Sequence, residues 1–528
     1  MADLDQSRPG KGRRAGDRTA VHPRTVVKGT CHHDCPDSCG WEATVEHRPE
    51  GPVAVRLRGN PDHPYSLGEL CPKVNRFLDR VYHPDRILHP LLRTGPKGSG
   101  EFRRASWDEA LEVVATRLRA VVDEHGGESV LPWGSAGTQG LVQMSSLDRR
   151  FFGALGASRL TGALCGNAAK EGVAATYGSG RTAEPTDVRY AKVVLLWGTN
   201  TKLTNRHLWP FVEEARAAGA PVVVIDPVRT ATAEAADWFL QPLPGTDTAL
   251  VLGVLHVLIR DDLVDHDYVA RYAEGFDALA AHVAEWTPER AAEACGVSVD
   301  DVERLAHLYG TTSPSFIRTL IGAEHIEHGA MFFRALACLP VVTGAWRHRG
   351  GGLSRSVGTW FDDNVDDGVY DLPPTPGQPR TRALQMNHLG RQLTDPAVGV
   401  HALFVWNGNP AVTLPNAGKV REGLARDDLF TVVSEQFLTD TARFADVIFP
   451  ATTQLEHLDA VVAWGHLNLG WNEPAIPPLG ESRCSGSTRP SPRSLARSKV
   501  GSAGWPRDMS DWLRSIARPV VVAKPPSA

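Results

Sequence analysis

A group of cysteines near the start of the chain limits what this protein can be more than any other stretch. Cys31, Cys35 and Cys39 recur at every fourth residue in a turn broken by proline, and Cys71 follows on a later loop. Thiolate is a soft ligand, so a set of four predicts zinc or an iron–sulfur cluster. Three clustered cysteines with one distant cysteine favour a cubane cluster, since zinc sites usually take two separated pairs.

The remaining alternative for these cysteines is a set of buried thiols or disulfides. The chain does not look secreted, because no hydrophobic segment follows Arg13-Arg14 before Cys31. Residues 1–24 instead predict a polar, flexible arm. The expected location is the cytoplasm, where disulfides are rare.

Length and composition narrow the class of protein. With 528 residues the chain is too long for one compact core, and about three domains are expected. A hydrophobic share of 42% and a charged share of 22% are ordinary for a globular protein. The net charge of −5 does not supply the basic face that nucleic acid requires, and no apolar run is long enough to span a membrane.

The residues after the cysteine turn predict a small β-rich domain and then a capped helix. Residues 41–45 and 53–58 alternate like two strands of a hairpin around Gly51-Pro52. Ser106 is placed to cap a helix that continues over residues 110–122, and Glu109 would complete a capping box.

Two pairs of apolar runs then predict parallel sheets. Residues 193–198 and 221–226 are continuous apolar strands around a helix at 211–218, which is typical of a parallel sheet covered on both faces. Further helices are expected at 247–261 and at 299–309, the second capped by Ser298. The chain segments that follow the strands should line a ligand site, because ligands bind at the carboxyl ends of parallel strands.

A second set of segments repeats this layout. Residues 402–410 again run from apolar residues to an aromatic residue, Gly and Asn, and residues 429–435 again end in an acid. The doubling predicts two related nucleotide-handling halves, each with an acid that accepts hydrogen bonds from a ribose or a guanine. The alternative is that Gly and Asp occur at strand ends in any α/β domain.

Together these segments resemble the molybdopterin oxidoreductases of the dimethyl sulfoxide reductase superfamily, which includes formate dehydrogenases and nitrate, polysulfide and thiosulfate reductases. The resemblance runs from about Thr30 to Glu481 and is specific because eight segments occur in the right order. They are the set Cys31/Cys35/Cys39/Cys71, Gly59-Asn60-Pro61, Trp107-Asp108-Glu109-Ala110, Trp197-Gly198-Thr199-Asn200, Asp226-Pro227-Val228-Arg229-Thr230, Pro244-Gly245-Thr246-Asp247, Trp406-Asn407-Gly408-Asn409-Pro410 and residues 441–450.

The resemblance implies a multidomain α/β fold in which a small β-rich iron–sulfur domain precedes two interleaved parallel-sheet domains. The expected parts are the arm at 1–24, the cluster domain at 25–90, a first pterin dinucleotide-binding region at 91–400 that is interleaved with the second, and the second region at 401–482.

The resemblance also implies two cofactors. One [4Fe–4S] cluster would be held by the four cysteines, with Lys73 between the cluster and the pterin, and Mo or W would be held by two molybdopterin guanine dinucleotides. Cys165 would be the protein ligand of that metal; the alternative is a buried core cysteine. Backbone amides at the strand–helix turns would bind the phosphates. The residues expected to bind the dinucleotides are Trp197, Gly198, Asn200, Asp226, Arg229, Thr230, Gly245 and Asp247, and, on the other side, Asn407, Asn409 and Glu435.

The implied activity is that of an oxidoreductase. It would pass electrons between a small substrate at the metal and a redox partner protein or electron-transfer subunit, through the cluster. Formate dehydrogenases carry His directly after the metal-binding residue, whereas this chain has Gly166, which disfavours formate. His457 and His466 could face the substrate but are not assigned a role, and Cys295 and Cys338 are interpreted as packing residues.

The end of the sequence departs from the family pattern. Residues 483–528 are rich in Ser, Arg and Pro and predict disorder in place of a further β-barrel domain. One hypothesis is a truncated or frameshifted reading frame near Arg483. Two alternatives to the active enzyme follow: an inactive relic of it, or a zinc-binding nucleotide-binding scaffold.

Overall fold

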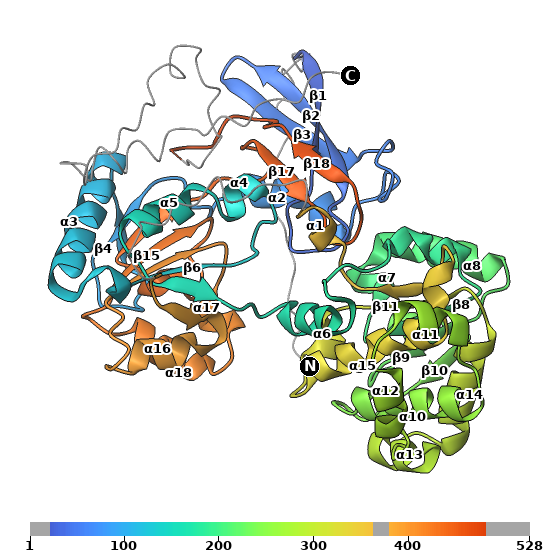
Figure 1. Cartoon of the computed structure of the whole chain (residues 1–528). Coiled ribbons are helices and arrows are strands. Elements are labelled where there is room, and N and C mark those ends of the chain that lie inside the picture. The colour runs from blue at the N-terminus through green and yellow to red at the C-terminus, as the bar shows by residue number, and fades with distance from the viewer. Residues whose placement is uncertain (1–21, 363–379, 482–528) are drawn as a thin grey trace, which may run out of the picture.

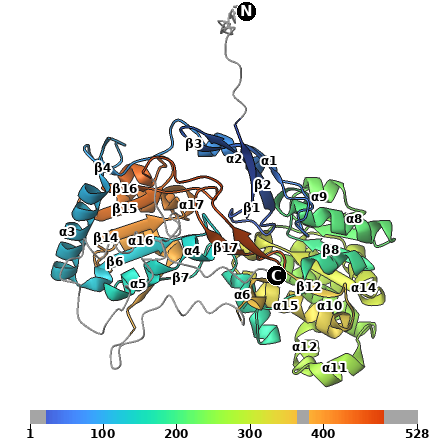
Figure 2. The ribbon, with the colours of Figure 1, turned by 90° about the horizontal axis from the view of Figure 1, so that it is seen from above.

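The computed structural model describes residues 22–362 and 380–481, which form three parts (Figure 1). A small β domain lies above two α/β units, and the view from above shows it bridging them (Figure 2). The predictions for residues 1–21 and 483–528 lie outside the described residues. Among the described helices, none is both long and apolar enough to cross a membrane.

The small β domain, here called the cluster domain, is built on a three-stranded antiparallel sheet in the order β1-β2-β3. The predicted hairpin is confirmed as β2 and β3, and β1 adds a third strand that the sequence pattern did not predict. Trp41 is fully buried in the core beneath the sheet. The elements are β1 (Arg24–Thr30), β2 (Gly40–Arg48), β3 (Gly51–Gly59), α1 (Pro72–Asn75) and α2 (Phe77–Val81).

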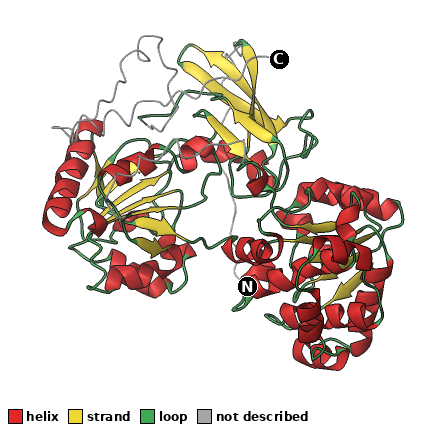
Figure 3. Cartoon of the chain, viewed as in Figure 1, coloured by secondary structure: helices red, strands yellow, loops and turns green. Residues whose placement is uncertain are grey.

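The first α/β unit contains a parallel sheet of five strands in the order β10-β9-β8-β11-β12. Alternate residues of β8 enter two different cores: Val193 and Leu195 pack on one face and Val194 and Leu196 on the other. This two-sided burial explains the continuous apolar run and confirms the predicted parallel sheet between helices (Figure 3).

Most helices of the structure belong to this unit. Its elements are α6 (Asn167–Tyr177), β8 (Val193–Trp197), α7 (Thr201–Thr204), η3 (Arg206–Leu208), α8 (Trp209–Ala217), β9 (Val222–Ile225), α9 (Ala231–Glu234), β10 (Trp238–Leu240), α10 (Asp247–Arg260), α11 (His266–Tyr272), α12 (Phe276–Val283), α13 (Pro288–Cys295), α14 (Val299–Thr311), β11 (Ser315–Thr319), η4 (Ile321–Glu324), α15 (Gly329–Val342) and β12 (Gly352–Ser354).

The second α/β unit contains a six-stranded sheet in the order β5-β4-β16-β15-β14-β6. Strands β6, β14, β15 and β16 are parallel, whereas β4 and β5 add an antiparallel edge. The elements are β4 (Leu91–Arg93), β5 (Phe102–Arg104), α3 (Trp107–His125), β6 (Val130–Gly134), α4 (Leu141–Met144), α5 (Leu147–Ala154), β7 (Arg159–Thr161), β13 (Ala383–Gln385), α16 (Leu389–Thr394), β14 (Ala402–Trp406), α17 (Pro410–Thr413), α18 (Ala417–Leu424), β15 (Phe430–Glu435) and β16 (Val447–Pro450).

The two units are interleaved along the chain. Residues 91–134 supply β4, β5 and β6 to the second sheet, although the sequence analysis counted residues 91–400 with the first region. Ala402 in β14 lies opposite Val130 in β6. Figure 1 shows this as one sheet containing both an early strand, β6, and late strands of the chain. The first unit is therefore an insertion between strands of the second.

Two predicted helix starts can be compared with the structure. Ser106 caps α3 by accepting the Glu109 N–H at 3.1 Å, and Ser298 caps α14 in the same way, so both caps are confirmed. The Glu109 carboxylate accepts a hydrogen bond from Arg103, and the Ser106 backbone N–H also lowers its pKa, so Glu109 takes part in the predicted capping box. Arg103 is available there because β5 ends just before the helix.

A late hairpin joins the second unit to the cluster domain. It consists of β17 (Asp459–Val462) and β18 (Leu469–Asn472) and lies beside β1 and α4 in both views (Figures 1 and 2). Asn472 accepts the Thr30 N–H at 3.1 Å, and Gln454 accepts the His32 N–H at 2.8 Å. Residues more than 400 positions away thus fix the backbone beside Cys31.

Candidate functional site

The structure brings together the four cysteines of the opening motif. The Cys31 N–H bonds to the Cys39 carbonyl at 2.8 Å and closes the loop that carries three of them. Cys71 is the N-cap residue of α1 and packs against the same core. Among the described residues no cysteine forms a disulfide, so the disulfide alternative is wrong.

The thiols of this loop are chemically suited to a cationic metal centre. Burial, together with the charges of the neighbouring Cys71 and Asp37, raises the pKa of Cys31 to about 12. Burial also raises the pKa of Cys35 and Cys39, and each feels the charges of the other cysteines of the set. These buried thiols lie close together and resist ionisation. They fit a site for a cationic group such as iron, because a bound cation compensates the charge of the thiolates.

Lys73 lies where the sequence placed it, two residues after Cys71 in α1. Its side chain is exposed, and its charge reaches the motif, since it lowers the pKa of Cys31 against the larger effect of burial.

Cys165 is half-buried in the turn before α6, within the first unit. Burial raises its pKa to about 11; the nearby Asp34 raises it too, whereas Arg355 lowers it through its charge and a hydrogen bond to the thiol. Asp34 belongs to the loop between Cys31 and Cys35 and accepts a hydrogen bond from Gln139 at 2.9 Å. The candidate metal ligand therefore lies beside the cluster loop.

Arg355 is the residue that organises this turn, and the sequence analysis missed it. Its guanidinium forms a buried ion pair with Glu324, whose other carboxylate oxygen accepts the Ala169 N–H of α6 at 2.9 Å. The Nε atom of Arg355 is buried and has no partner among the described residues. An unpaired buried donor on the arginine that contacts the Cys165 turn fits a site that binds a further group.

The same arginine explains Gly166. A Cβ atom at this position would lie 2.6 Å from Nη2 and 2.7 Å from Nη1 of Arg355. A side chain there would displace the guanidinium from Cys165. In the sequence, only the glycine at position 166 could have indicated that a large side chain packs beside Cys165.

The carboxyl ends of β8 and β9 form what we call the first corner, residues 197–204 and 226–232. Gly198 follows β8 in the left-handed conformation, with φ of +59°. The Thr232 hydroxyl donates to Asn200 Oδ1 at 2.7 Å and accepts the Lys202 N–H at 3.0 Å. Asn200 in turn caps α7 with its carbonyl, so one threonine fastens both loops of this corner.

The ends of β14 and β15 form the second corner, residues 406–413 and 435–441, with the same hydrogen bonds. Asn407 is left-handed with φ of +55°. The Thr441 hydroxyl donates to Asn409 Oδ1 at 2.6 Å and accepts the Ala411 N–H at 3.0 Å. The two corners therefore share a left-handed residue and the same Asn–Thr hydrogen bonds. This is more than the α/β fold alone requires, and it supports the predicted doubling.

Several predicted dinucleotide residues point into the protein. Trp197 is fully buried and donates from Nε1 to Asp247 at 2.7 Å. Burial raises the pKa of Asp247. The side-chain oxygens of Asn200 and Asn409 accept the threonine hydroxyls of the two corners. Thr230 caps α9 by accepting the Ala233 N–H at 3.3 Å.

Other predicted residues lie at the sheet edge. Asp226 is half-buried and accepts the Val228 N–H at 2.9 Å, and Arg229 is exposed over the Phe239 ring, 4.5 Å from its centroid. Gly245 is exposed just before α10. The Asn407 amide donates to the Gln143 carbonyl at 3.0 Å, and burial raises the pKa of Glu435.

The two histidines without an assigned role are buried. His457 bonds to the Thr452 hydroxyl at 2.8 Å, and His466 bonds from Nε2 to the Asp37 carbonyl at 3.0 Å. Cys295 is fully buried in the core, as predicted, and its thiol donates to the Ala291 carbonyl at 2.8 Å.

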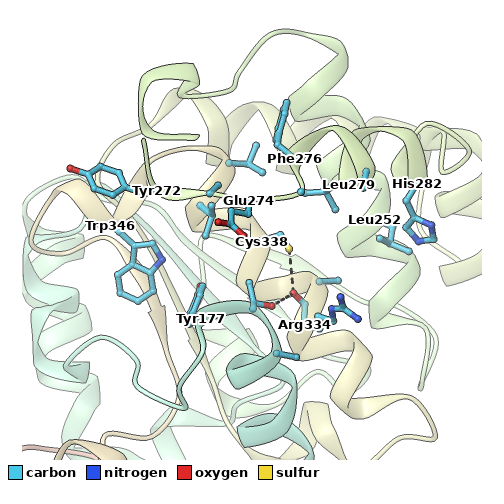
Figure 4. A pocket seen from close by; sticks show the side chains of 18 of the residues that line it. Tyr177, Leu252, Tyr272, Glu274, Phe276, Leu279, His282, Arg334, Cys338 and Trp346 are labelled. Atoms are coloured by element: carbon cyan, nitrogen blue, oxygen red, sulfur yellow. Dashed lines mark hydrogen bonds between the residues drawn. The ribbon is translucent and has the colours of Figure 1, made fainter. Parts of the chain in front are cut away.

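A cavity of about 1230 Å³ lies elsewhere, between α6, α11, α12 and α15 (Figure 4). Aromatic side chains such as Tyr177, Phe276 and Trp346 line it together with Arg334 and Cys338. Its lining contains none of the predicted ligands, so it is separate from the candidate site. Cys338 is thus a cavity residue as well as a packing residue.

Comparison with known families agrees with this geometry. Residues 24–83 match the molybdopterin oxidoreductase Fe4S4 domain, and residues 86–485 match the molybdopterin oxidoreductase family. The chain therefore belongs to the molybdopterin oxidoreductases. The two domains indicate a Mo- or W-pterin cofactor and a [4Fe–4S] cluster.

Individual relatives support the same family. A probable oxidoreductase, YoaE of Bacillus subtilis, is 39% identical over 464 residues, which cover 88% of this chain and 67% of the relative. The F420-dependent formate dehydrogenase subunit alpha of Methanocaldococcus jannaschii is 28% identical over 82% of this chain and 64% of its own length. The chain thus spans about two thirds of the length of these two relatives.

A solved structure shows the same fold. Acetylene hydratase from Pelobacter acetylenicus superposes with a TM-score of 0.71 over 86% of this chain and 67% of the other, at 23% identity.

Proposed function

We propose that this chain is the catalytic part of an oxidoreductase that uses Mo or W held by two molybdopterin guanine dinucleotides. It would pass electrons between a small substrate and an external redox protein through a [4Fe–4S] cluster on Cys31, Cys35, Cys39 and Cys71. The position of Cys165 carries the proposal, because Asp34 of the cluster loop is close enough to raise the pKa of that thiol. The bound metal would supply the two-electron redox chemistry.

The two corners support the binding of two dinucleotides. Each places an acid, Asp226 or Glu435, at the carboxyl end of a parallel strand, where ligands of open α/β sheets bind. Exposed Arg229 and the backbone amides before α10 suit a diphosphate. The Asn–Thr pairs would hold these loops in shape before the dinucleotides arrive.

Arg355 supports a role in orienting both ligand and substrate. It stabilises the thiolate form of Cys165, which is the form that binds metal. Its unpaired Nε would donate a hydrogen bond to an oxygen atom of the substrate. Since the guanidinium occupies the space beside Gly166, there is no room there for the histidine that formate dehydrogenases carry, which disfavours formate.

Lys73 would ease the transfer of electrons. Its positive charge already reaches Cys31 in the cluster loop. A fixed cation beside the cluster lowers the cost of adding an electron.

The direct test is elemental and cofactor analysis of the purified chain. We expect four iron atoms, one Mo or W and two pterin guanine dinucleotides per chain, with an EPR signal after reduction. One zinc per chain without pterin would instead indicate the zinc-binding scaffold. Anaerobic assays with nitrate, sulfur oxyanions, aldehydes and formate would then identify the substrate class.

The role of Arg355 can be tested without the cofactor. In the metal-free protein, R355Q should slow alkylation of Cys165 at pH 9 several-fold, because the pKa of about 11 rises further when the guanidinium is lost. Mass spectrometry of the Cys165 peptide measures the rate.

Arg334 provides the matched control. Burial raises the pKa of Cys338 to about 11 as well, and Arg334 lowers it. R334Q should therefore slow alkylation of Cys338 and leave Cys165 unchanged. Equal rates for Cys165 in R355Q and in the parent protein would rule out the role of Arg355.

A further inference from the structure

A buried hydrogen-bonded group joins the cluster loop to the first α/β unit. Asp37 lies in the loop between Cys35 and Cys39, and His207 comes from η3 of the first unit; both are at most 2% exposed. His207 Nδ1 lies 2.7 Å from Asp37 Oδ2 and 3.5 Å from Cys39 Sγ. The three ligating-type atoms of this group lie within 4.8 Å of one another.

The partners fix the roles of these groups. Asp37 Oδ1 accepts a further hydrogen bond from Asn205 Nδ2 at 2.5 Å, so both oxygens of the carboxylate are occupied by donors. A carboxylate with only donors around it acts as an acceptor in its charged form. The hydrogen on His207 Nδ1 therefore points to the carboxylate, and Cys39 Sγ, 3.5 Å from Nδ1 and 3.9 Å from Nε2, lies beside the ring.

The group continues away from the cluster loop. Arg318, which is fully buried, donates to Asn205 Oδ1 at 2.8 Å and to the Arg355 carbonyl at 2.8 Å. Side chains of the first unit thus connect the surroundings of Cys39 with the arginine beside Cys165. Among the described residues, all hydrogen-bond donors to the Asp37 carboxylate belong to Asn205 and His207 of the first unit.

We propose that Asp37 and His207 set the reduction potential of the [4Fe–4S] cluster with opposite effects. Reduction adds negative charge to the cluster and its thiolates. A buried carboxylate in the ligand loop disfavours that charge and lowers the potential, whereas the His207 N–H that donates to this carboxylate offsets part of its charge and raises the potential. His207 is a positioning residue, since it acts through Asp37.

This inference rests on the proposed assignment of Cys39 as a cluster ligand. It goes further because it makes the potential depend on a residue of another domain. If the first unit moved relative to the cluster domain, the N–H of His207 would leave Asp37 and the cluster would become harder to reduce.

The test is an EPR-monitored redox titration of the purified, cluster-containing full chain and of two variants. D37N should shift the midpoint potential upward, because it removes a buried negative charge. H207F should shift it downward, because it removes the N–H that offsets the charge of the Asp37 carboxylate. Opposite signs are the signature, since general loosening of the loop would move both variants in the same direction.

His256 provides a matched control. It is an imidazole of α10 in the same unit and bonds from Nδ1 to the Val283 carbonyl at 2.9 Å. Helix α10 lies on the side of the unit away from the cluster domain (Figure 1). H256F should leave the potential unchanged. If H207F does not retain the cluster, D37N decides: an upward shift supports the inference, and no shift or a downward shift overturns it.

Failure of the underlying assignment gives a different result. A parent protein without an EPR-active cluster, or a C39A variant that keeps an unaltered signal, would contradict the proposed ligand set. An intact cluster in the parent, with unchanged or equally signed shifts in D37N and H207F, would overturn only the role of the Asp37–His207 pair.

Discussion

The two corners share their hydrogen bonds but differ in the residues that fill them. Thr232 and Thr441 make the same pair of hydrogen bonds, yet the left-handed position is Gly198 in the first corner and Asn407 in the second. The acid is Asp226 in one and Glu435 in the other. The Asn–Thr pairs, which both corners share, fix the backbone. The residues that differ fit the different neighbours of each corner.

The left-handed positions show why the difference arose. A Cβ atom on Gly198 would lie 2.6 Å from the Cβ of Ala323, so this position has no room for a side chain. Asn407 has room, and its amide donates to the Gln143 carbonyl. Asn is also one of the few residues that tolerates this conformation.

Exchanging these two residues should give the largest effect. G198N should lower the free energy of unfolding by about 2–4 kcal/mol, because it combines overpacking with a strained backbone. N407G should change it by less than about 1 kcal/mol, since glycine adopts this φ freely and loses one hydrogen bond. The midpoints of urea unfolding measure both. Equal losses in the free energy of unfolding would show that the two positions do not differ in the room they leave for a side chain.

Removing the threonine hydroxyls should give an intermediate and symmetrical effect. T232V and T441V should each lower the free energy of unfolding by about 1–3 kcal/mol. T232V leaves the part-buried Lys202 N–H and Asn200 Oδ1 without the hydroxyl, and T441V leaves the buried Ala411 N–H, while Asn409 Oδ1 keeps the Thr441 N–H at 3.1 Å. Differential scanning calorimetry can compare the two variants.

Thr311 is the control for this comparison. It makes one exposed hydrogen bond to the His307 carbonyl in α14, so T311V should stay within about 0.5 kcal/mol of the parent. A much larger loss in one corner than in the other would break the equivalence of the two threonines.

Neutralising the two acids should give the smallest effect, and it should depend on pH. Burial raises the pKa of both Asp226 and Glu435. An acid with a raised pKa in the folded state loses stability as the pH rises from its unfolded pKa through its folded pKa. D226N and E435Q should therefore be more stable than the parent by less than about 1 kcal/mol at pH 7, and equal to it near pH 3.

The measurement is thermal unfolding of the cofactor-free chain at both pH values. A variant that is less stable than the parent at pH 7 would show that the carboxylate is stabilised by a partner, against the direction given by its burial.

Local patterns in the sequence predicted much of the fold. The apolar runs of β8, β9, β14 and β15 and the caps at Ser106 and Ser298 depend on neighbouring residues, which the sequence displays directly. Glu109 also binds Arg103 of a preceding strand, and this contact is not visible in the local pattern.

The candidate site depended more on contacts between distant residues. The cysteine motif could be read because three ligands are adjacent. Arg355 is far from Cys165 in the chain, and His207 is far from Cys39, so no periodicity or spacing indicates either contact. Trp197 and Asp247 were predicted at the cofactor edge, but their side chains bond to each other, because a buried indole N–H requires an acceptor.

The insertion of the first unit also has a consequence for protein synthesis. Val130 of β6 pairs with Ala402 of β14, which the ribosome adds 272 residues later. At typical elongation rates that interval is roughly 15–50 s. During this time β6 has no partner from β14 and presents an open strand edge, which is a hazard for aggregation. The sheet of the second unit is thus the part of the protein that must be protected longest from aggregation while the chain is made.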